Sequence, residues 1–105
     1  MAEIMKLKEL VIYQNNAIVS KTIVEKETGT VTLFAFAKDQ ALSEHTAPFD
    51  ALVQVIEGRT EIRIAGVPHR VNEGEMLVMP AHQSHALKAL TPFKMLLTMI
   101  RSESK

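Results

Sequence analysis

Short apolar runs separated by turn residues recur along the whole chain. Runs rich in Val, Ile, Leu, Thr and Phe predict strands over residues 17–25, 31–37, 51–56, 60–65, 67–71, 76–79, 84–90 and 93–101. Turns containing Gly29, Gly58, Gly66 and Gly74 separate several of these runs. Because the runs follow one another at short intervals, the pattern indicates a β-sandwich or β-barrel rather than alternating strands and helices.

The spacing within one run indicates how a strand is buried. In the run 60–65, Ile62 and Ile64 alternate with Glu61 and Arg63, which is typical of a strand with one packed and one wet face. A chain of many short strands must also protect its sheet edges, usually by closing into a barrel or a jelly roll. We therefore predict a single all-β domain over residues 1–105, with a barrel core at about 17–101. The segment 1–16 precedes it, with a short helix from Ala2 to Val11.

Composition narrows the range of partners. The chain has 105 residues, a common size for one domain. Its 12 basic and 12 acidic residues balance and are scattered, which argues against nucleic-acid binding. The lack of cysteine excludes disulfides and thiolate metal sites. No apolar stretch is long enough for a membrane span or a signal peptide, so we expect a cytoplasmic protein with no membrane partner.

Two segments carry histidine, glycine and proline at fixed spacings. Residues 45–58 read HTAPFDALVQVIEG and residues 74–85 read GEMLVMPAHQSH. They resemble the two motifs of the cupin superfamily. The first motif is His-any-His, three or four residues, Glu, six residues, Gly, and the second is Gly, five residues, Pro, any, Gly, two residues, His. His45 and Gly58 fit the first, and Gly74, Pro80 and His85 fit the second. The resemblance implies a cupin barrel, also called a double-stranded β-helix or jelly roll.

Three positions depart from the motifs. Ala47 stands where the second histidine belongs, Ala51 where the glutamate belongs, and His82 where the second motif has glycine. Two of the four metal ligands usual in the family are therefore replaced by alanine, which places the metal chemistry of the family in doubt.

The inward face of the barrel gives the candidate pocket. Since side chains alternate inward and outward along a barrel strand, we expect His45, Ala47, Ala51 and Val53 to face the interior. His85 should meet them from the opposite strand. Each histidine can be either a ligand-binding group or a pocket residue hydrogen-bonded to a neighbour, and the sequence leaves both readings open.

A metal is one possible occupant of this pocket. His45, His82 and His85 together could hold one divalent ion, such as Zn, Ni, Mn, Fe or Cu. His82 could instead lie on the rim in solvent. Asp50 could replace the missing glutamate, although capping of the turn 48–50 is the simpler interpretation.

Three functions fit these features. The first is a stand-alone barrel that binds a small molecule, with or without a divalent metal. The second is a metal-dependent enzyme, like the dioxygenases or isomerases of the family, using the three histidines. The third is a non-catalytic sensory or regulatory barrel. For assembly we predict a homodimer that buries outer-face residues such as Phe34 and Phe36, because the run 31–37 is apolar on both faces.

Overall fold

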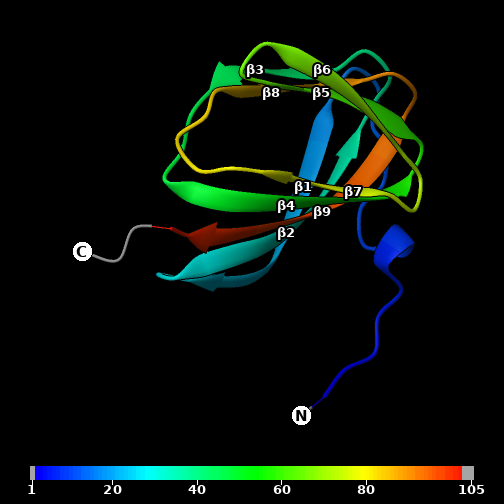
Figure 1. Ribbon diagram of the computed structural model, residues 1–105. Coiled ribbons are helices and arrows are strands. Elements are labelled where there is room, and N and C mark those ends of the chain that lie inside the picture. The colour runs from blue at the N-terminus through cyan, green and yellow to red at the C-terminus, as the bar shows by residue number, and fades with distance from the viewer. Residues whose placement is uncertain (1, 103–105) are drawn as a thin grey trace.

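Two antiparallel sheets face each other and enclose the interior of the protein (Figure 1). The computed structural model describes residues 2–102. A single 3-10 turn, η1 (Leu7–Glu9), precedes the strands β1 (Ile18–Lys26), β2 (Gly29–Phe36), β3 (Ala41–His45), β4 (Phe49–Glu57), β5 (Arg59–Ile64), β6 (Val67–Asn72), β7 (Met76–Met79), β8 (His85–Ala89) and β9 (Phe93–Arg101). One sheet has the order β1-β2-β9-β4-β7 and the other has the order β3-β8-β5-β6. The predicted all-β jelly roll is confirmed.

The core lies between the two sheets and follows the alternation of each strand. On β4, Ala51, Val53 and Val55 point inward and are at most 2% exposed, whereas the residues between them are partly exposed. Phe36 and Phe93 are fully buried, and their rings stack with centroids 4.6 Å apart. Full burial of a large apolar side chain contributes about 1.5–3 kcal/mol, so each of these two rings stabilises the barrel.

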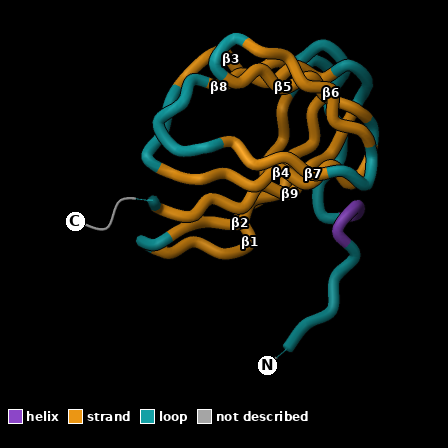
Figure 2. The backbone as a smooth tube through the Cα atoms, viewed as in Figure 1, coloured by secondary structure: helices purple, strands orange, loops and turns teal. Residues whose placement is uncertain are grey.

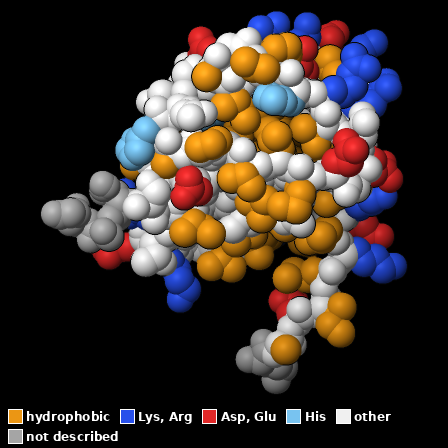
Figure 3. Space-filling view, viewed as in Figure 1, with side chains coloured by type: hydrophobic (Ala, Val, Ile, Leu, Met, Phe, Trp, Pro, Cys, Tyr) orange, Lys and Arg blue, Asp and Glu red, His pale blue; other side chains and the backbone are white. Residues whose placement is uncertain are grey.

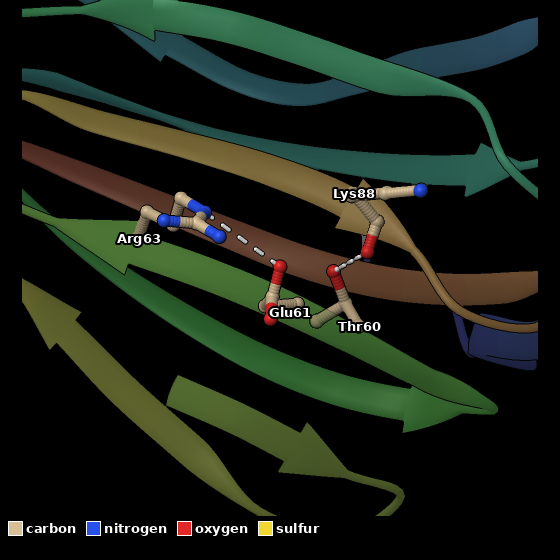
Figure 4. Close-up of polar contacts among 4 residues, drawn as sticks. All are labelled: Thr60, Glu61, Arg63 and Lys88. Carbon is tan, nitrogen blue, oxygen red and sulfur yellow. Dashed lines mark hydrogen bonds and ion pairs between the residues drawn. The ribbon is translucent and has the colours of Figure 1, made fainter. Parts of the chain in front are cut away.

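Strand β5 has the half-buried pattern that its sequence predicts. Ile62 is fully buried, while Glu61 and Arg63 lie on the outer face and form an ion pair at 3.8 Å (Figure 4). Thr60 is also fully buried, and its hydroxyl donates a hydrogen bond to the backbone carbonyl of Lys88 at 2.8 Å. This bond satisfies the one polar side chain that β5 places inside the barrel.

Two predicted elements differ from the structure. The helix predicted from Ala2 to Val11 is wrong, since only the three-residue turn η1 forms there. Strand β3 was not predicted, because its sequence ALSEH has little apolar alternation. Its strand structure comes instead from pairing with β8, a contact that no local pattern reveals. Among residues 2–102, no helix has the length and apolar character that a membrane crossing requires.

The placement of Phe34 and Phe36 on the outer face is also wrong. Phe36 belongs to the interior core, and Phe34 packs against it. The other side of β2 carries Leu33 and Ala35, which are buried under Val11 from the N-terminal segment. The chain therefore covers part of the outer face of its own five-stranded sheet.

Polar contacts hold the N-terminal segment on that outer face. The Lys94 ammonium donates to the backbone carbonyl of Lys8 at 2.5 Å and lies 5.0 Å from the centroid of the Tyr13 ring. The Tyr13 hydroxyl donates to the Glu57 carboxylate at 2.6 Å. Burial, and then the Glu57 carboxylate, raise the pKa of Tyr13, so the hydroxyl keeps its proton and the bond.

The backbone conformation at Gly58 explains why the first motif has glycine at this position. Its φ is +79°, a conformation that favours glycine. A Cβ atom at this position would also collide with the backbone carbonyl oxygen of Pro92. The tight turn between β4 and β5 therefore requires a residue without a side chain.

Candidate functional site

A cavity of about 240 Å³ lies between the sheets. Side chains from β3 and β8 of one sheet and from β4, β7 and β9 of the other enclose it, together with the loop 46–48. The lining residues are Leu42, His45, Ala47, Phe49, Ala51, Met79, His85, Leu87, Met95, Leu97 and Met99. A larger hollow of about 390 Å³ around Gln54 and Glu75 is open to solvent and contains neither cavity histidine.

A β-bulge aims His45 into this cavity. On the ladder between β3 and β8, Leu42 pairs with Leu87 and His45 pairs with His85, so β3 carries one more residue than β8 between these pairs. Strict alternation would send Leu42 and His45 to opposite faces, and the extra residue brings both to the inner face. The rings of His45 and His85 consequently lie 4.3 Å apart between centroids, tilted by 67°.

Backbone carbonyls determine the protonation of both rings. His45 Nδ1 lies 2.8 Å from the carbonyl oxygen of Ser43, and His85 Nδ1 lies 3.3 Å from that of Gln83. Because a carbonyl oxygen can only accept, both Nδ1 atoms must carry the proton. In the neutral rings both Nε2 atoms are therefore free acceptors. Burial, and then the neighbouring His45, lower the pKa of His85, which favours its neutral form.

The loop 80–84 joins β7 of one sheet to β8 of the other at the end where loops connect the sheets (Figure 2). His82 N–H donates to the carbonyl of Ala47 at 2.9 Å, and Ala81 N–H donates to the Asp50 carboxylate at 3.0 Å. The Ser84 hydroxyl donates to the Glu44 carboxylate at 2.8 Å. Asp50 thus caps the facing loop and is absent from the cavity lining.

Comparison with known proteins agrees with this architecture. The family model described as the cupin domain matches residues 32–100. The chain belongs to the cupin family.

Solved cupins and one uncharacterised protein share its fold. A conserved protein of unknown function from Streptococcus pyogenes is 35% identical, with a TM-score of 0.93 over 99% of this chain and 91% of that chain. A cupin 2 conserved barrel domain protein from Leptotrichia buccalis is 42% identical, with a TM-score of 0.89, over 91% of this chain and 47% of that one. This chain therefore spans about half of the Leptotrichia protein. No curated protein matches the sequence.

The structure brings together four of the five residues predicted for the pocket. His45, Ala47, Ala51 and His85 line the cavity, whereas Val53 is fully buried in the core and is absent from the lining. Met79, Met95 and Met99 also line the cavity. Sequence reasoning missed Leu42, Phe49, Leu87 and Leu97. The alternation of Met95, Leu97 and Met99 along β9 could have located Leu97.

The residues of this cupin do not fit the three-histidine metal site. His82 is exposed, and its backbone has a left-handed φ of +67°. Within residues 2–102, no three or more His, Asp or Glu side chains gather closely enough to hold a metal ion. The positive φ shows why the second cupin motif has glycine at this position: the turn needs a conformation that other residues adopt only at a cost. The backbone at His82 therefore has the left-handed conformation expected of the motif glycine, although the residue here is histidine.

Proposed function

We propose that this cupin binds a small, mostly apolar molecule in the cavity between its sheets. The observation that carries the proposal is the lining itself: nine apolar side chains surround two imidazoles that face each other. Small-molecule sites generally combine an apolar wall with a few convergent polar groups. The volume of about 240 Å³ exceeds the cavity of about 150 Å³ that accommodates benzene in another protein. A ligand of one ring with a small substituent would fit.

The chemistry of the lining supports binding more directly than catalysis. Among residues 2–102, the cavity lining contains no serine, carboxylate or lysine that could act as a nucleophile or as a second acid–base group. The metal-dependent alternative needs a third ligand, and the two alanines at positions 47 and 51 supply none. A sensory or regulatory role would also begin with occupation of this cavity, so the same binding experiment bears on that alternative.

Methionine methyl groups provide the test. Met79, Met95 and Met99 line the cavity, whereas Met76 on the outer face is 57% exposed. In protein labelled at the methionine methyls, a nuclear magnetic resonance screen of single-ring compounds should shift the three cavity resonances and leave Met76 unchanged. The Ala51→Leu variant, whose added side chain fills the cavity, should lose the response. A screen in which no compound moves the cavity methyls would overturn the proposal.

A further inference from the structure

We infer that the cavity prefers ligands that donate a hydrogen bond through a neutral hydroxyl group, such as small phenols and alcohols, over carboxylates. The inference rests on the proposed function and adds the chemical class of the ligand. It follows from which polar atoms face the cavity and from which of them are already engaged.

Both histidines line the cavity, His85 from a buried position and His45 from a solvent-exposed one. The Nδ1 protons of His45 and His85 are directed to the carbonyls of Ser43 and Gln83, at 2.8 and 3.3 Å. Each neutral ring is left with an Nε2 lone pair and no further N–H. The other lining side chains are alanine, leucine, methionine and phenylalanine, which offer no strong partner to a ligand. A ligand therefore gains a hydrogen bond here only by donating one.

Charged ligands are disfavoured for two reasons. Among residues 2–102, a carboxylate would find no Lys or Arg in the lining, and Glu44, the residue before His45, is itself a carboxylate. An ammonium group can donate, but burial in an apolar cavity removes its hydration without supplying a counter-charge in the lining. A neutral hydroxyl has the smaller desolvation cost and matches the Nε2 acceptors.

The test compares ligands of similar size in matched variants. Toluene has no donor, phenol is a neutral donor, benzoate is an anion and benzylamine is a cation. Their dissociation constants would be measured from the methionine methyl shifts in the wild-type protein, in a variant that combines His85→Leu with His45→Leu, and in His69→Leu. His69 is an exposed histidine on β6 and is absent from the cavity lining, so its substitution controls for loss of a histidine elsewhere.

The decisive quantity is the ratio of phenol affinity to toluene affinity. Comparing this ratio between variants cancels the different hydration of the two ligands. Because a buried hydroxyl without a partner is penalised, the ratio should fall about tenfold when His85→Leu and His45→Leu are combined, which removes both acceptors, and stay unchanged in His69→Leu. Toluene itself should bind the leucine variants about as well as the wild type, which also shows that they fold.

Each other outcome identifies what is wrong. If toluene and phenol bind with the same ratio in all variants, or if benzoate or benzylamine binds tightest, the preference for a neutral donor is overturned and the binding cavity stands. If none of the four compounds reaches the cavity methyls, the proposed function falls as well.

Discussion

Filling the cavity should stabilise the protein, which is an unusual outcome for a buried substitution. Ala51 is 2% exposed and lines the cavity, so the three extra carbons of an Ala51→Leu side chain would occupy existing space. At about 0.8 kcal/mol for each buried carbon the gain is about 2.4 kcal/mol. Loss of about 0.5–1 kcal/mol of leucine rotamer entropy leaves a net gain of about 1.5 kcal/mol. The melting temperature should rise by about 6–12 °C.

Ala89→Leu is the matched control for this prediction. Ala89 is also fully buried, but it lies in the filled core and is absent from the cavity lining. The same added carbons should there overpack the core and destabilise the protein by about 1–3 kcal/mol. Denaturant unfolding followed by circular dichroism would give both midpoints at a constant slope. If Ala51→Leu were as destabilising as Ala89→Leu, the space beside His45 and His85 would not exist, and the reasoning about ligand binding would fail with it.

Three further predictions concern backbone strain, pH and assembly. His82→Gly should raise the free energy of unfolding by about 0.5–1 kcal/mol, because removing the strain of the left-handed φ outweighs the added flexibility of the unfolded chain. The control His69→Gly, in strand β6, should lower the free energy of unfolding. A less stable His82→Gly protein would mean that the His82 side chain makes stabilising contacts of its own. Because the pKa of His85 is lower in the folded protein, the unfolded chain binds more protons, and the free energy of unfolding should fall as pH drops through about 6.5. In His85→Leu the free energy of unfolding should fall less steeply between pH 8 and 5. Equal pH slopes in the two proteins would contradict a buried neutral His85 ring. We also expect a homodimer, now through the exposed outer-face residues Met76, Val78 and Ile100. Figure 3 shows that hydrophobic side chains gather on one face of the molecule. Light scattering should report a dimer that Val78→Asp converts to a monomer, and a monomeric wild type would refute this.

The sequence was informative wherever local pattern and spacing decide the structure. The eight predicted strands are all present, because each combines β-favouring residues with a glycine or proline boundary. The motif spacings also located His45 and His85, which the structure places 4.3 Å apart. Gly58 was expected in a turn, and the structure places it in the tight turn between β4 and β5, where a Cβ atom would collide with the carbonyl oxygen of Pro92.

The wrong sequence predictions concern features that depend on contacts between distant parts of the chain. Alternation along β2 correctly predicts that Phe34 and Leu33 lie on opposite faces of the strand. Because both faces carry apolar residues, alternation does not predict which face is directed to the interior. That choice depends on the N-terminal segment, which covers the Leu33 side with Val11. The helix predicted from Ala2 to Val11 did not form: only Leu10 and Val11 of this segment pack on the sheet, and its other large apolar residues are exposed.

The ring nitrogens of His45 and His85 offer the most direct test of the central claim, that the barrel encloses a ligand cavity with two imidazole acceptors. A long-range proton–nitrogen correlation spectrum at neutral pH reports which nitrogen of each ring is protonated. We predict protonated Nδ1 and unprotonated Nε2 in both rings, with the Nε2 resonances moving towards the hydrogen-bonded range when phenol is added. Protonated Nε2 atoms, or Nε2 resonances that ignore phenol while other signals move, would contradict it.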